Sequence, residues 1–165
     1  MYFLGESYLQ TGKPQEAIAP LARALDINKT DADAMYKMGT AYAQMGQHVE
    51  AIVYFEKAVM FVPDFAEVYA GMSQSYDALG ETAKAGYARG MLAYSTEDLE
   101  TARQELEQAV SALPDYAPAF VGLSLTYERL GDLSKAKTAA EAALLLEPNN
   151  FMAQQTLGRI EAAQK

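Results

Sequence analysis

Few residues in this chain of 165 are of the types that carry out chemistry. His48 is the only histidine, cysteine is absent, and no second ligand or clustered carboxylate accompanies His48. A metal centre needs several such ligands, and a general base needs a positioned partner. Neither a glycine-rich phosphate loop nor a nucleophile elbow occurs. We therefore expect no enzyme, no metal and no cofactor, and we interpret His48 as structural or solvent-exposed.

The charge pattern excludes a further class of function. The net charge is −9, and residues 97–116 alone contribute six acidic side chains against Arg103. A nucleic-acid-binding protein needs a basic stripe, and none exists here. The acidic stretch is interpreted as a solvated helix face, with a docking patch for a basic partner as the alternative. Apolar runs are too short to span a bilayer, and the composition leaves the compartment open, cytoplasmic or, within a larger exported protein, periplasmic.

A fixed period organises the elements that position these residues. Gly12, Gly46 and Gly80 are spaced by 34 residues, and so are Pro114 and Pro148. Such a period is typical of stacked helical repeats. The interval from Pro63 to Pro114 is 51 residues, which is one and a half periods. The array is therefore expected to contain one irregular segment.

Residues 32–65 show the content of one period. Two stripes of small and large apolar residues follow helical spacing, separated by Gly46 and ended by Pro63. The residues of these stripes are Met35, Met38, Gly39, Tyr42, Ala51, Phe55, Ala58 and Val59. The unit is therefore predicted as a helix, a tight turn, a second helix and another turn.

This frame resembles the tetratricopeptide repeat (TPR), which has an aromatic, Leu-Gly, Tyr, Ala, Phe and Pro at these positions. Met35 and Met38 stand for the aromatic and the leucine, and Lys29 stands where the first unit would have proline. The resemblance covers nearly all of the chain. It implies an all-α, right-handed α-solenoid of antiparallel helix pairs that acts as a non-catalytic protein–protein interaction module.

The periodicity predicts ten helices and no strand, within one array spanning residues 1–165. The helices are expected near 2–10, 14–27, 32–44, 48–61, 66–79, 82–95, 97–112, 117–130, 133–146 and 151–164. The repeats are expected near 1–31, 32–65, 66–116 and 117–150, followed by a capping helix at 151–164. The third repeat is irregular, with three helices, and the chain is expected to be a fragment of a longer protein.

The helix at 82–95 is the odd one. As a second helix it would place Arg89 in the core, and as a first helix only Gly90 fits well. It matches neither role cleanly and is predicted to be unpaired. Because neighbouring helices alternate in direction, an odd helix predicts a break in superhelical phase near 80–97, with a regularly stacked but degenerate helix as the alternative.

The resemblance also implies a concave groove lined by the first helices, which would hold a protein or peptide partner. Carried over position by position, its residues are Tyr36, Thr40, Gln74, Asp77, Leu125 and Glu128, joined by Tyr87, Met91 and Tyr94 if 82–95 acts as a first helix. Rigid aromatics and adaptable methionine suit a peptide. The alternative is that these tyrosines only cover neighbouring helices. Lys37 and Gly71 exclude the clamp by which some TPR domains hold a C-terminal carboxylate.

The N-terminal end suggests a second function. Met1, Tyr2, Phe3 and Leu4 place apolar side chains on the first helix with no cap residue. An exposed apolar end of a solenoid favours association. The alternative to peptide binding is therefore a self-assembling scaffold that forms a homo-oligomer through this end.

Overall fold

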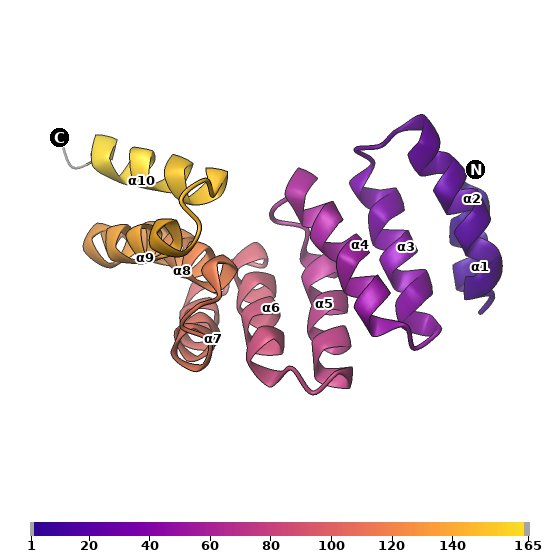
Figure 1. Cartoon of the computed structure of the whole chain (residues 1–165), viewed down its shortest axis with the longest axis horizontal. Coiled ribbons are helices and arrows are strands. Elements are labelled where there is room, and N and C mark those ends of the chain that lie inside the picture. The colour runs from indigo at the N-terminus through magenta and orange to yellow at the C-terminus, as the bar shows by residue number, and fades with distance from the viewer. Residues whose placement is uncertain (1, 164–165) are drawn as a thin grey trace. The chain divides into compact units, whose positions relative to one another are not determined.

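The computed structural model describes residues 2–163, which form ten α-helices and no strand (Figure 1). Their bounds are Tyr2–Gln10 (α1), Pro14–Ile27 (α2), Ala32–Gln44 (α3), His48–Phe61 (α4), Ala66–Ala78 (α5), Thr82–Ser95 (α6), Leu99–Ala112 (α7), Ala117–Leu130 (α8), Leu133–Leu146 (α9) and Phe151–Ala163 (α10). Met1, Gln164 and Lys165 lie outside the described residues. Within that range no helix is long and apolar enough to cross a membrane.

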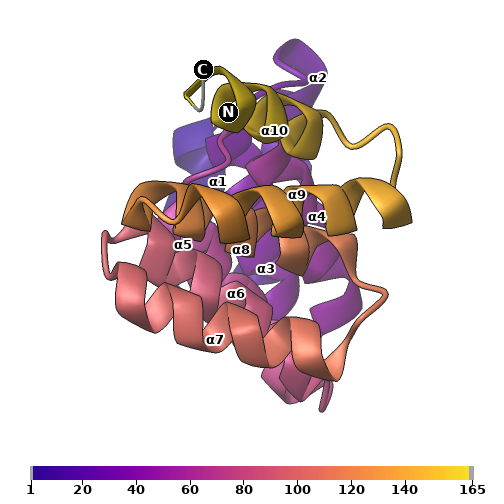
Figure 2. The same cartoon turned by 90° about the vertical axis from the view of Figure 1, so that its left-hand side faces the viewer.

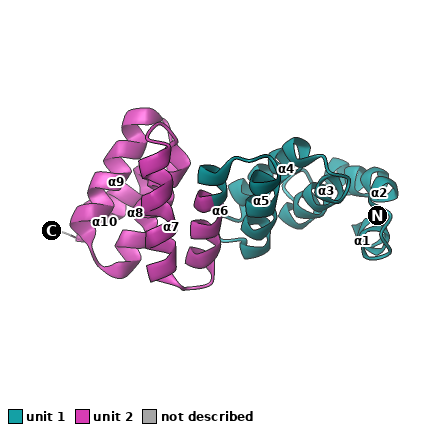
Figure 3. Ribbon diagram, turned by 90° about the horizontal axis from the view of Figure 1, so that it is seen from below, with its two compact units in different colours: residues 1–85 teal, residues 86–165 magenta. Residues whose placement is uncertain are grey.

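The chain divides into two compact units, residues 1–85 (unit 1) and residues 86–165 (unit 2), with the boundary inside α6 (Figure 3). In unit 1 the pairs α1/α2 and α3/α4 are followed by α5, and each helix packs on the next. The first helices of the pairs also touch, α1 on α3 and α3 on α5. Unit 1 is thus a short stack of antiparallel pairs with its first helices side by side.

The turn within the α3/α4 pair shows how the sequence produces this geometry. Gly46 has a positive φ of 74°, a conformation that other residues adopt at a cost. It lets the N–H of Gln47 return to the carbonyl of Tyr42 at 2.9 Å, which closes the end of α3. At the start of α3, the side chain of Asp31 accepts the N–H of Ala34 at 2.9 Å. Short capped turns therefore keep the two helices antiparallel.

Phe55 of α4 occupies the centre of unit 1. Its ring is 1% exposed and lies between two glycines of neighbouring first helices, Gly39 of α3 and Gly71 of α5. A Cβ atom at either glycine would come within 2.6 Å of a ring carbon of Phe55. The small residues predicted at the helix crossings thus let the backbones approach while the large ring fills the space between them.

Unit 2 repeats this arrangement one and a half periods later. Leu106 of α7 takes the place of Phe55, and a Cβ at Gly90 of α6 or at Gly122 of α8 would lie 2.6 Å or 3.1 Å from its side chain. Each of these three residues is 51 positions after its counterpart in unit 1. The structure therefore places α6 in the first-helix position toward α7, a role that the sequence had left open.

The turn between α6 and α7 explains why that role was hard to recognise. Glu97 stands 51 positions after Gly46, at the same point of the repeat. Among the described residues it is the only non-glycine residue with a positive φ, which is 68°. Gly131 follows it by 34 residues. The period therefore resumes at Glu97 without its glycine. The predicted start of α7 at residue 97 is wrong by two residues, because Glu97 forms the turn and Asp98 caps the helix by accepting the N–H of Thr101 at 3.2 Å.

The C-terminal helix α10 packs on α9 and α8, as the predicted capping role requires (Figure 2). Ala153, Thr156 and Ile160 form its buried face. At the other end of the chain, Phe3 is 80% exposed on α1 and Leu4 is 47% exposed. Self-association through α1 stays a prediction.

Candidate binding groove

A pocket of about 380 Å³ lies in unit 1 between α3, α4 and α5. Its lining residues are Tyr36, Thr40, Ala43 and Gln44 from α3, His48 and Phe55 from α4, and Glu67, Ala70, Gly71, Gln74 and Ser75 from α5. The residues from α3 and α5 recur at spacings of one, three and four positions, which places them on one face of each helix. This set of residues is called the unit 1 groove below.

Two buried polar atoms in the unit 1 groove have no hydrogen-bond partner. They are Oγ of Ser75, a residue that is 1% exposed, and Nδ1 of His48. Among the described residues, no other buried side-chain nitrogen or oxygen lacks a hydrogen-bond partner. Both atoms belong to residues that line the groove. A buried polar group without a partner costs about 1–3 kcal/mol. Both atoms are closed to solvent in this structure, so a side chain has to move before an occupant of the groove can reach either of them.

An aromatic wall flanks these atoms. The ring of Tyr36 lies 5.2 Å from that of Phe65 and 6.1 Å from that of Phe55, centroid to centroid. The ammonium of Lys37 lies 5.4 Å from the Tyr36 centroid and forms a 3.0 Å ion pair with Glu6. Tyr36 is thus held by ring contacts with Phe55 and Phe65 and by a cation beside it.

Two other pockets are less well suited to a specific ligand. One of about 530 Å³ is lined by turn residues and helix ends around Ala32 and Phe61 in unit 1. Another of about 230 Å³ lies between α8 and α9 around Phe120 and Ala139. Neither includes a buried polar atom without a partner. Within the described residues no group of three or more His, Cys, Asp or Glu side chains could hold a metal ion.

Comparison with known families decides the class of the protein. The sequence profile described as tetratricopeptide repeat matches residues 8–73 and 93–160. The chain belongs to the tetratricopeptide repeat family. The two matches leave out the end of α5 and most of α6, the segment where the period shifts. TPR arrays present extended concave binding surfaces and are interaction modules rather than catalysts.

Three solved structures are similar to this chain. MamA 41-end from Desulfovibrio magneticus RS-1 is 25% identical, with a TM-score of 0.50, 98% of this chain covered and 81% of that chain. TTC0263, a thermophilic TPR protein from Thermus thermophilus, is 26% identical, with a TM-score of 0.46 and coverages of 99% and 80%. YrrB, described as a TPR protein with an unusual peptide-binding site, is 20% identical, with a TM-score of 0.48 and coverages of 93% and 88%. Comparison with curated proteins gave no match.

The TPR frame predicted four groove residues in unit 1. Tyr36, Thr40 and Gln74 line the unit 1 groove together, as their spacing on the first helices implies. The hydroxyl of Thr40 donates to the carbonyl of Tyr36 at 2.9 Å, so its hydrogen is already used. Asp77 is exposed on α5 but is not part of the lining. Their role in binding stays a prediction.

The equivalent groove of unit 2 is filled by its own side chains. Tyr87, Met91 and Leu125 are 7%, 5% and 8% exposed, which leaves them little surface for a partner. Met91 stands 51 positions after Thr40, and its sulfur would lie 2.6 Å from a Cβ at Gly122. Leu125 stands 51 positions after Gln74. Apolar side chains thus stand in unit 2 at positions that polar ones occupy in unit 1, and Met91 is longer than its counterpart Thr40.

The two remaining predicted residues of unit 2 take part in ion-pair and ring contacts. Arg159 of α10 binds Glu128 of α8 through two hydrogen bonds of 3.0 Å and 2.7 Å. The guanidinium of Arg129 lies 5.2 Å from the ring centroid of Tyr94 and is paired with Glu97. Tyr94 also packs against the cluster that contains Leu125. These contacts join α6, α8 and α10 within unit 2.

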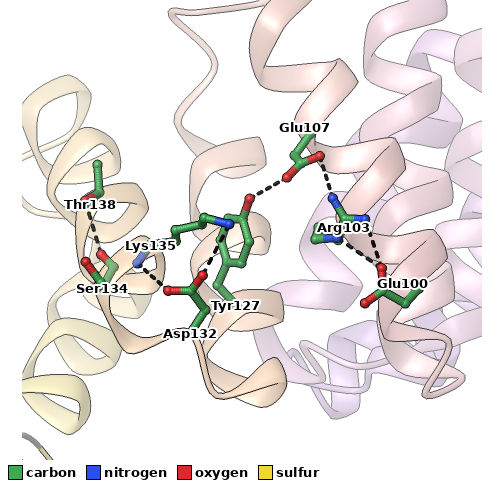
Figure 4. A network of polar contacts seen from close by, with 8 residues as sticks. All are labelled: Glu100, Arg103, Glu107, Tyr127, Asp132, Ser134, Lys135 and Thr138. Atoms are coloured by element: carbon green, nitrogen blue, oxygen red, sulfur yellow. Dashed lines mark hydrogen bonds and ion pairs between the residues drawn. The ribbon is translucent and has the colours of Figure 1, made fainter.

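The acidic stretch is likewise largely paired within unit 2 (Figure 4). Tyr127 donates a short hydrogen bond to Glu107, which also pairs with Arg103 at 2.9 Å. Arg103 binds Glu100 as well, at 2.9 Å. Burial, and then the Glu107 carboxylate, raise the pKa of Tyr127 to about 12, while the Tyr127 hydroxyl and Arg103 lower the pKa of Glu107. The network links α7 to α8. Because these carboxylates are already paired, the acidic stretch fits the interpretation as a helix face better than the interpretation as a docking patch for a basic partner.

Sequence reasoning missed four polar groove residues, which are Gln44, His48, Glu67 and Ser75. Gln44 and Ser75 lie eight positions after Tyr36 and Glu67, so a lining that includes positions i+7 and i+8 would have found them. His48 was set aside because it had no catalytic partner. Its position at the start of α4, beside the end of α3, is what brings it to the groove.

Proposed function

We propose that this chain binds a peptide segment of a partner protein and that the unit 1 groove is the binding site. The observation that carries the proposal is an open pocket whose lining joins the ring of Tyr36 to the polar side chains of Gln44, Glu67 and Gln74. A pocket of about 380 Å³ has room for a side chain with its backbone.

The rest of the lining supports a peptide rather than a small apolar ligand. Gln44 and Gln74 are exposed at the rim, and each carries both a donor and an acceptor, as a peptide group does. Tyr36 adds an aromatic side chain of low conformational freedom, a type that is enriched at the energetic centres of interfaces. Membership of the TPR family gives the expected class of ligand independently of these contacts.

The filled groove of unit 2 supplies the design of the test. Replacing Thr40 by methionine and Gln74 by leucine would place in unit 1 the residues that stand 51 positions later, Met91 and Leu125. The double variant should keep its helical content and lose peptides that wild type selects from a displayed random library. Affinity is expected to fall by at least about tenfold, since methionine at position 40 takes up pocket volume and leucine at position 74 removes the hydrogen bonds of the amide.

A matched control makes the same changes on an exposed helix face. Thr101→Met with Gln104→Leu alters two exposed residues of α7, three positions apart and outside the groove. This control should bind as wild type does. Selected peptides that bind the Thr40→Met/Gln74→Leu variant with unchanged affinity would show that the unit 1 groove is not the site.

A further inference from the structure

We propose that the unit 1 groove recognises an arginine side chain in a basic segment of the partner. This inference rests on the proposed peptide-binding function and specifies the chemistry of the peptide. Its first support is the absence of lysine and arginine among the lining residues, whose one charged side chain is Glu67.

The lining offers several hydrogen-bond acceptors. Thr40 has already donated its hydroxyl hydrogen to Tyr36, so only its lone pairs remain. His48 accepts through Nδ1 when Nε2 carries the proton, and Ser75 Oγ has free lone pairs. The carbonyl oxygens of the two glutamines add further acceptors at the rim. Guanidinium has five N–H donors in a planar fork and can use several of these acceptors at once.

Charge points to the same occupant. Residues 1–85 hold 6 basic and 11 acidic side chains, a net charge of −5. Lys37, the basic residue beside Tyr36, is already paired with Glu6 at 3.0 Å. A cationic side chain therefore meets attraction at the groove, and Glu67 at its edge offers a carboxylate to pair with.

The aromatic side chains favour arginine over lysine. Tyr36 lines the groove and is half-buried, so it is the ring that an occupant can meet, whereas Phe55 is 1% exposed. A planar guanidinium stacks on an aromatic face while its edges donate hydrogen bonds, whereas an ammonium is a compact and strongly hydrated point charge. A neutral glutamine side chain lacks the positive charge that would pair with Glu67.

The test uses the full chain and three capped tripeptides, acetyl-Ala-Arg-Ala-amide and its citrulline and lysine counterparts. Citrulline keeps the shape of arginine but is neutral. Amide NMR titration should show shifts at Gly71, Gln74 and Ser75 with the arginine peptide. The citrulline peptide should bind at least about tenfold more weakly, because its charge-assisted hydrogen bonds are lost, and the lysine peptide should lie between them.

Two variants and a control assign the contacts. Ser75→Ala removes the unsatisfied hydroxyl, and Glu67→Gln removes the charge at nearly constant shape. Each should weaken the arginine peptide severalfold. Glu16→Gln makes the same charge change at an exposed position of α2 outside the groove and should leave the affinity as in wild type.

Equal binding of the arginine and citrulline peptides, or of the arginine and lysine peptides, would overturn the arginine inference and leave peptide binding in place. Shifts confined to residues 97–116 would overturn it too, because they would report attraction to the acidic stretch. If library selection also yields no peptide that depends on Thr40 and Gln74, the proposed function fails as well.

Discussion

Two glycines at the same position of the repeat should respond in opposite ways to alanine. Gly39 in α3 and Gly158 in α10 both lie inside first helices, and Gly158 corresponds to Gly39 in the TPR frame. A Cβ at Gly158 would meet nothing within 4 Å. A Cβ at Gly39 would lie 2.6 Å from two ring carbons of Phe55 and 3.1 Å from the carbonyl oxygen of Ala51.

These contacts set the sign and size of each effect. Alanine in a helix interior is favoured over glycine by about 0.5–1 kcal/mol, so Gly158→Ala should stabilise the chain by that amount. The same gain at Gly39 is opposed by overpacking, which costs about 1–3 kcal/mol. Phe55 cannot move away easily, because Gly71 approaches its other side and the ring is 1% exposed. We therefore expect Gly39→Ala to destabilise the chain by roughly 1–2 kcal/mol.

Urea unfolding and thermal unfolding, both followed by circular dichroism, compare the two variants with wild type. The free energies of unfolding of the two variants should differ by about 2 kcal/mol, which corresponds to thermal midpoints that differ by roughly 4–8 °C. Adding Phe55→Leu to Gly39→Ala should recover part of the loss, since the smaller side chain relieves the clash. If Gly39→Ala proves as stable as Gly158→Ala, the close packing of Phe55 against α3 is refuted.

Two further predictions concern unit 2. One tyrosine should ionise near pH 12 in a spectrophotometric titration, because burial and Glu107 raise the pKa of Tyr127 to about 12 from 10.0. The stabilising contribution of Tyr127 is complete below pH 10 and declines between pH 10 and 12. Glu107→Gln should lower the pKa of Tyr127. An unchanged tyrosine titration in Tyr127→Phe would contradict the assignment. Asp132→Ala should lower the free energy of unfolding in urea by about 1 kcal/mol, because the Asp132 side chain caps α9 by accepting the N–H of Lys135. Asp132→Asn should retain most of that stability, and an equal loss in both variants would point to charge rather than capping.

Most of the fold was predictable because local chemistry fixes it. Turn glycines such as Gly46 and the prolines after second helices mark where helices end, and the sequence therefore indicated all ten helices. The role of α6 was not predictable in the same way. Its turn to α7 uses Glu97 in a conformation typical of glycine, so the marker of the period is missing from the sequence at that point.

The groove was predictable in part. Helical spacing identified Tyr36, Thr40 and Gln74 as members of one face, and the structure brings them together. Spacing does not report whether a face is open. In unit 2 that depends on the length of Met91 and on the bare backbone of Gly122, which meet only after the helices have packed.

The offset of 51 residues between the two units has a consequence for how such proteins change over time. The same backbone frame carries an open groove where Thr40 and Gln74 stand and a closed one where Met91 and Leu125 stand. Opening or closing a site therefore needs side-chain substitutions within the lining and no rearrangement of helices. A repeat array of this kind can gain or lose binding sites one repeat at a time, because other residues, at the turns and helix crossings, determine the fold of each repeat.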